Sequence, residues 1–83
     1  MKGNILIIED NEQNLYLTTF ILEKHGYKAH AAMDGRTGID LADRLVPDMI
    51  LLDIQLPVMD GYAVAQNLRL NPKLSHTPII AVT

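Results

Sequence analysis

The chain contains no cysteine and no tryptophan among its 83 residues. Without cysteine it can form neither a disulfide framework nor a thiolate metal site, so any metal ion must be bound by oxygen or imidazole ligands. No apolar run approaches the roughly 20 residues of a membrane-spanning helix. The first four residues lead directly into an aliphatic run, which leaves no room for a signal peptide. We therefore expect a cytoplasmic protein.

Aromatic and basic side chains are also scarce. The chain has three tyrosines, one phenylalanine and seven lysines and arginines, and its formal net charge is -3. A nucleic-acid-binding surface is usually basic and often interleaved with aromatic residues, and neither feature is present here. We therefore expect protein partners, with no direct binding of nucleic acid or membrane.

Short aliphatic runs alternate along the chain with longer stretches that lack proline and glycine. Because the runs are too short for helices, we predict buried strands at residues 4–8, 48–52 and 78–83, and a weaker edge strand at 27–32. We predict helices at residues 11–25, from Asp34-Gly35 to Pro47, and from Asp60-Gly61 to Asn71-Pro72.

The order of these elements is βαβαβαβ, with a helix at every connection. This order predicts one α/β domain over residues 1–83, built on a doubly wound parallel sheet. Either Asp10 or Asn11 can cap the first helix, and Asp60 can cap the third.

Three carboxylates follow two of the predicted strands. Glu9 and Asp10 come after the first strand, and Asp53 comes after the third. The carboxyl ends of parallel strands meet at one edge of a sheet, so we expect the three acids to converge there. Clustered carboxylates repel one another and raise their own pKa values unless a cation lies between them. Since carboxylate oxygen suits Mg²⁺, the sequence predicts a magnesium site.

The same edge can support chemistry on a phosphoryl group. A dinucleotide-binding protein would place a glycine-rich, phosphate-binding loop after its first strand, whereas this chain has the acidic residues 9–12. With a divalent cation present, a carboxylate can attack phosphorus in line and form an aspartyl phosphate. Asp53 is the best placed nucleophile because it ends a central strand. Thr83 ends another strand at this edge and offers a hydroxyl to a phosphoryl oxygen.

Three segments carry a resemblance to a known family. They are Ile-Ile-Glu-Asp-Asn at 7–11, Asp-Ile-Gln-Leu-Pro-Val-Met-Asp-Gly at 53–61, and Ile-Ala-Val-Thr at 80–83. Together they resemble the receiver domain of two-component response regulators, in particular stand-alone regulators of the cell-cycle or chemotaxis type. The resemblance implies the flavodoxin-like (βα)5 receiver fold, represented here only through its fourth strand.

The resemblance also implies a mechanism. Asp53 would accept a phosphoryl group from a phosphohistidine of a histidine kinase or phosphotransfer protein, and the domain would then signal through a downstream protein target. Asp10, Asp53 and the backbone carbonyl of Gln55 would bind Mg²⁺, with Glu9 acting through water or hydrogen bonds. Thr83 would be the switch hydroxyl.

Receivers of this family continue past the fourth strand through a fourth helix, a fifth strand that ends in lysine, and a fifth helix. We expect all three elements to be lacking from these 83 residues. The fourth strand is then an open edge that carries Ile79, Ile80 and Val82, and the helix at 11–25 loses its second cover. We expect either self-association through one of these two surfaces or a longer protein of which these 83 residues are a part.

Two alternatives remain open. One is a phosphorylation-incompetent receiver fragment that acts as an interaction module, because the family's lysine is not expected here. The other is a phosphohydrolase with an aspartyl nucleophile, as in the haloacid dehalogenase family. That family needs a second acid two residues after the nucleophile, and Gln55 in this position cannot transfer a proton. We predict no enzymatic activity beyond catalysis of the domain's own phosphotransfer and dephosphorylation.

Overall fold

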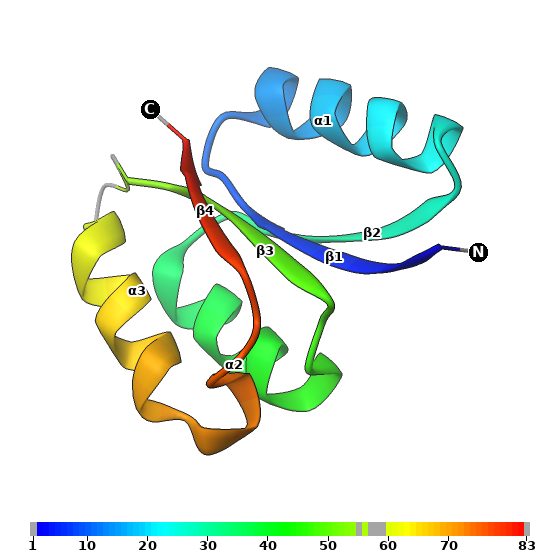
Figure 1. Cartoon of the computed structure of the whole chain (residues 1–83). Helices are drawn as coiled ribbons and strands as arrows, with labels where there is room; N and C mark the ends of the chain where they lie inside the picture. The colour runs from blue at the N-terminus through cyan, green and yellow to red at the C-terminus, as the bar shows by residue number, and fades with distance from the viewer. Residues whose placement is uncertain (1, 55, 57–59, 83) are drawn as a thin grey trace.

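The computed structural model of the chain describes residues 2–54, 56 and 60–82. Four parallel strands form one sheet in the order β2-β1-β3-β4 (Figure 1). The strands are β1 Gly3–Ile8, β2 Tyr27–Ala32, β3 Met49–Asp53 and β4 Ile79–Val82. The helices are α1 Glu12–Lys24, α2 Gly35–Leu45 and α3 Gly61–Leu70, followed by the short 3-10 helix η1 Pro72–Leu74. The predicted α/β fold with a parallel sheet is confirmed.

The helices divide between the two faces of the sheet. In Figure 1, α1 lies on one face, and α2 and α3 lie side by side on the other. The central strand β1 is therefore covered on both sides, and all of Ile5–Ile8 is buried. This cover explains why the sequence of β1 is a continuous aliphatic run instead of an alternating one.

Each helix begins with a side-chain cap at the same edge of the sheet. The side-chain oxygen of Asn11 accepts a hydrogen bond from the Asn14 N–H at 2.9 Å. Asp34 accepts from the Thr37 N–H at 2.8 Å, and Asp60 accepts from the Ala63 N–H at 2.9 Å. Of the two predicted candidates for the first cap, Asn11 is the one used. The side chain of Asp10 therefore belongs to the loop after β1.

The largest part of the core lies between the sheet and the α2–α3 layer. Leu6, Ile8, Ile50 and Leu52 point from β1 and β3 toward this layer, and each is at most 1% exposed. Buried side chains of α3 and η1 complete the cluster, namely Val64, Leu68 and Leu74. The core thus anchors α3 against the end of β3.

The opposite face of the sheet is covered unevenly. Ile80 pairs with Leu51, which in turn pairs with Ile7, so these three side chains share the face that carries α1. Ile7 is 3% exposed, whereas Ile80 and Val82 are each 46% exposed. Ile79 faces the other way and packs against the core, so it is not part of the exposed edge as the sequence had predicted.

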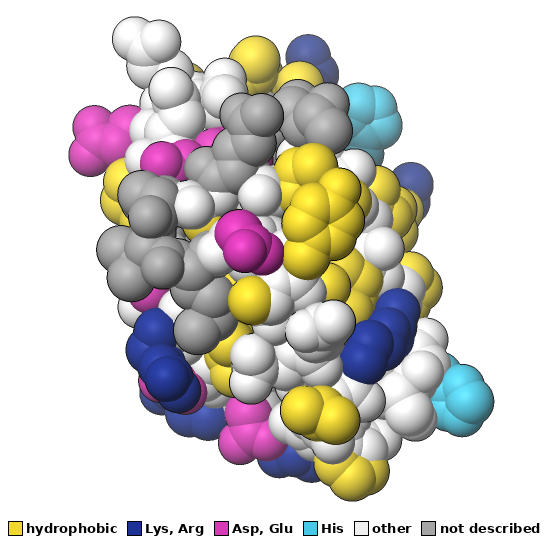
Figure 2. Space-filling view, turned by 90° about the vertical axis from the view of Figure 1, so that its left-hand side faces the viewer, with side chains coloured by type: hydrophobic (Ala, Val, Ile, Leu, Met, Phe, Trp, Pro, Cys, Tyr) yellow, Lys and Arg dark blue, Asp and Glu magenta, His cyan; other side chains and the backbone are white. Residues whose placement is uncertain are grey.

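Helix α1 contributes no buried residue. Its large apolar side chains Tyr16, Leu17, Phe20 and Ile21 are all exposed. Hydrophobic side chains are also exposed on the side of the molecule that carries α3, which Figure 2 shows in yellow. Among the described residues, no helix is long and apolar enough to cross a membrane.

Candidate metal centre

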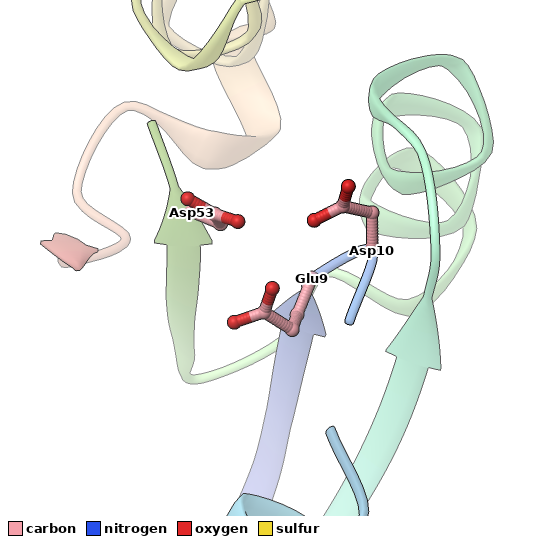
Figure 3. A group of neighbouring side chains, drawn as sticks. All are labelled: Glu9, Asp10 and Asp53. Carbon is pink, nitrogen blue, oxygen red and sulfur yellow. The ribbon is translucent and has the colours of Figure 1, made fainter. Parts of the chain in front are cut away.

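The three predicted acids meet at one edge of the sheet. Glu9 and Asp10 follow β1, and Asp53 is the last residue of β3. Strands β1 and β3 are neighbours, with Ile8 paired to Leu52, so the residues that follow this pair lie side by side. One carboxylate oxygen from each acid lies within 4.8 Å of the other two. Figure 3 shows the three carboxylates pointing toward one another.

The surroundings of Glu9 disfavour the charged form of its carboxyl group. Burial raises the pKa of Glu9 above its usual value, and the Asn11 N–H, 3.2 Å from Oε2, partly opposes this effect. A hydrogen bond with Asp53 and the charges of Asp53 and Asp10 raise the pKa of Glu9 further. A carboxyl group whose charged form is destabilised in this way gains from a bound cation.

Backbone hydrogen bonds fix the positions from which the acids project. The Glu9 N–H donates to Ala32 O of β2 at 2.9 Å, and the Ile54 N–H donates to Val82 O of β4 at 3.3 Å. Helix α3 also contacts the backbone that follows Asp53, because the Gly61 N–H donates to Ile54 O at 3.1 Å. The backbone next to Glu9 and Asp53 is therefore held by hydrogen bonds to β2, β4 and α3.

A cavity of about 540 Å³ opens beside the acids. A water molecule occupies roughly 30 Å³ in the liquid, so this space accommodates a hydrated cation and a phosphoryl group. Besides the three acids, its lining consists of Asn11, Asn14, Leu17, Thr18 and Val82. Sequence reasoning did not single out Asn14 or Thr18. Their four-residue spacing on a helix that begins at the acids is the signal that could have found them.

Two other acids near this edge are helix caps. Asp60 caps α3. Asp34 caps α2, and its hydrogen bonds from the Thr37 N–H and hydroxyl lower the pKa of its carboxyl group. Gln55 and Thr83 lie outside the described residues. Of the five predicted site residues, the structure thus brings together Glu9, Asp10 and Asp53.

The donor set is chemically consistent with Mg²⁺. All three groups offer oxygen, and Mg²⁺ usually binds through one or two carboxylates with water or substrate oxygens in its remaining positions. Asp10 is exposed and Asp53 is half-buried, so both remain accessible from the cavity. The fourth predicted ligand, the carbonyl of Gln55, is not described.

Comparisons with known proteins agree on one family. A family model described as "Response regulator receiver domain" matches residues 5–83. The polar-differentiation response regulator DivK of Brucella anthropi is 41% identical over the whole chain, which spans 68% of that protein. The response regulator PleD of Caulobacter vibrioides is 39% identical over the whole chain, which spans only 18% of its length.

Solved structures give the same result. The receiver domain of sensor histidine kinase PA1611 from Pseudomonas aeruginosa is 35% identical and superposes with a TM-score of 0.95. The match covers all of this chain and 68% of that one, whose structure is described as having a magnesium ion coordinated in the active site cleft. Chemotaxis protein CheY4 of Vibrio cholerae is 26% identical, with a TM-score of 0.93, over 98% of this chain and 68% of that one.

Proposed function

The chain belongs to the family of response regulator receiver domains, and from this membership we propose that Asp53 is its phosphoacceptor in two-component signalling. One observation carries the proposal. The carboxylate of Asp53 lies within 4.8 Å of those of Glu9 and Asp10, in a cavity large enough for a cation and a phosphoryl group. Clustered acids around an accessible nucleophile are what a cation-dependent phosphotransfer site requires.

We propose that Asp10 and Asp53 hold Mg²⁺ together with the backbone carbonyl of Gln55, and that Glu9 acts through water or a hydrogen bond. When bound, the ion neutralises charge on the phosphoryl oxygens. An oxygen of Asp53 forms the new bond to phosphorus. The bond from phosphorus to the donor's imidazole nitrogen breaks, and its electron pair returns to the ring. We propose that the hydrogen-bonded backbone next to Asp53 helps to orient its carboxylate for this attack.

The role of Thr83 follows from its place directly after β4. We propose that its hydroxyl donates a hydrogen bond to the transferred phosphoryl group and moves toward it on phosphorylation. We further propose that the donor is a phosphohistidine of a histidine kinase or phosphotransfer protein, and that a downstream protein recognises the phosphorylated form.

We also propose that the 83-residue chain self-associates through the β4 edge or through α1. The support is the exposure of Ile80 and Val82 at that edge and of Tyr16 and Phe20 on α1. Exposed apolar groups gathered in this way favour association in water.

The experiment is incubation of the chain with acetyl phosphate and Mg²⁺, followed by measurement of intact mass. We expect the wild type to gain one phosphoryl group, and we expect Asp53→Asn, or removal of Mg²⁺ by a chelator, to abolish the gain. Asp60→Asn is the matched control. It removes another acid from the same edge, and asparagine caps a helix as well as aspartate does, so it should be phosphorylated normally.

Other results of this experiment would contradict the assignment of Asp53 or favour one of the two alternative functions. Phosphorylation that persists in Asp53→Asn contradicts the assignment of the nucleophile. A folded wild type that is never phosphorylated favours the interaction module. Turnover of a phosphate ester favours the phosphohydrolase, despite the absence of an acid at position 55.

A further inference from the structure

Gly61, the first residue of α3, lies directly against the backbone that follows Asp53. It is buried, and its N–H donates to Ile54 O at 3.1 Å. A Cβ atom added at this position would overlap Ile54 Cα and would lie 2.9 Å from Asp53 O. These are backbone atoms, so no side-chain rotation can make room for the added carbon.

Neither side of this contact can move freely. Helix α3 is anchored in the core by Val64 and Leu68, which are 0% and 1% exposed. On the other side, Ile54 is bonded to β4 through Val82 O. The added Cβ therefore forces a displacement, and since Ile54 lies just beyond the last residue of β3, we expect its backbone and that of Asp53 to shift.

From this geometry we propose that Gly61 is a positioning residue for the site. The absence of a side chain at position 61 lets α3 approach β3 closely enough to hold the Asp53 carboxylate within reach of Glu9 and Asp10. The proposal rests on the function proposed above in so far as the cluster binds Mg²⁺. That ion demands near-ideal octahedral geometry with ligands at about 2.0–2.1 Å, so a small shift of Asp53 weakens binding.

Gly38 provides a matched control. It is also buried, and it lies inside α2, so Gly38→Ala makes the same chemical change in a helix. Its added Cβ would meet the side chain of Ile8, 2.5 Å from Cδ1, and not the backbone of the site. The added Cβ would also lie 2.7 Å from Cγ1 and 3.2 Å from Cγ2, so Ile8 has to shift, but the backbone contact between Gly61 and Ile54 stays unchanged.

The experiment measures Mg²⁺ affinity by calorimetry for the wild type, Gly61→Ala and Gly38→Ala. Loss of a group that orients a metal ligand typically weakens binding by 10–100-fold, so we expect Gly61→Ala to lose at least about tenfold. Gly38→Ala leaves the contact of Gly61 with Ile54 intact, so we expect it to lose clearly less affinity than Gly61→Ala does. Equal affinities for the wild type and Gly61→Ala would overturn the proposal.

A second measurement does not depend on metal. Backbone amide chemical shifts of the metal-free proteins should change at Asp53, Ile54 and Val82 in Gly61→Ala, but not in Gly38→Ala. If these shifts do not change, Gly61 does not position Asp53, whether or not the wild type binds Mg²⁺. If the wild type binds no Mg²⁺, that result alone contradicts only the proposed function.

Gly61→Ala can also fail to fold. In that case all three proteins are measured again in trimethylamine N-oxide, which favours the compact state. A variant that refolds there should show the same loss of Mg²⁺ affinity. One that stays unfolded overturns the proposal, because the glycine then serves the fold as a whole and not the site.

Discussion

At the scale of single residues, the charge balance of the site centres on Glu9. Burial and the neighbouring acids raise the pKa of its carboxyl group, so the folded chain binds a proton there more tightly than the unfolded chain does. By linkage, this group favours folding below the ordinary glutamate pKa of 4.5, and the contribution is lost as pH rises through the raised value.

The first prediction follows from the direction in which the pKa of Glu9 changes on folding. Without metal, the thermal stability contributed by the cluster should fall as pH rises from the ordinary pKa of Glu9 through its raised value. Glu9→Gln should flatten this part of the pH profile, and Mg²⁺ should reduce the loss by stabilising the charged form. Circular dichroism melts across this range provide the measurement. Glu23→Gln, which removes an exposed acid of α1, is the control.

If the thermal stability of Glu9→Gln depends on pH as that of the wild type does, protonation of Glu9 is not linked to folding. In that case the acids would be solvated surface groups, and the reason for expecting a cation would disappear.

At the scale of the elements, each helix depends on the residue that caps it. Asp34 makes the strongest case, because both of its oxygens accept hydrogen bonds, one from the Thr37 N–H at 2.8 Å and one from the Thr37 hydroxyl at 3.1 Å. These bonds lower the pKa of Asp34, so its contribution to stability is present at neutral pH and is lost as pH falls through the lowered value.

We predict that Asp34→Ala lowers the free energy of unfolding at neutral pH, because the first turn of α2 loses its N-cap. Urea unfolding monitored by circular dichroism measures the change. Asp40→Ala, at an exposed position inside α2, is the control and should change stability by less than about 0.5 kcal/mol. Equal effects of the two substitutions would contradict the capping role.

The elements were largely predictable, because their signals are local. Aliphatic runs bounded by Pro47, Gly26 and acidic residues gave the strands and helices, and parallel order brought Glu9 and Asp53 together. Local signals fail where the contact is distant in sequence. Lys73 of η1 and Asp43 of α2 form an ion pair at 2.9 Å, although they are 30 residues apart in sequence. No pattern within either segment predicts this contact.

The same limit explains what was missed at the site. Gly61 was interpreted as part of a turn and cap, since the sequence carries no sign that its Cα lies against the backbone of Ile54. Asn14 and Thr18 were also missed: their four-residue spacing places them on one side of α1, and the cavity shows that this side faces the acids.

At the scale of the whole molecule, cover is unequal on the two faces of the sheet. Helices α2 and α3 bury Leu6, Ile8, Ile50 and Leu52 on one face, whereas α1 leaves Ile80 and Val82 exposed on the other (Figure 1). Apolar side chains of α1 and β4 thus remain in water, and each carries a free-energy cost that association would remove.

The third prediction concerns association. Light scattering should give a mass above the 9.3 kDa of one chain, increasing with concentration. Ile80→Lys should lower this mass if the β4 edge is the contact, and Phe20→Lys should lower it if α1 is. Tyr62→Lys changes a side chain on α3 that is 69% exposed and should have no effect. A compact, stable monomer at all concentrations would contradict the prediction.

The central claim is that Glu9, Asp10 and Asp53 form one cation site, and Mn²⁺ used in place of Mg²⁺ tests it most directly. This paramagnetic ion broadens the NMR signals of nearby amides. At low Mn²⁺ occupancy we expect the amide signals of Glu9, Asp10 and Asp53 to broaden first. Excess Mg²⁺ should restore these signals, and Asp53→Asn should abolish the broadening. Broadening that begins at other acids, such as Asp40 and Asp43 of α2, or that Asp53→Asn leaves unchanged, would contradict it.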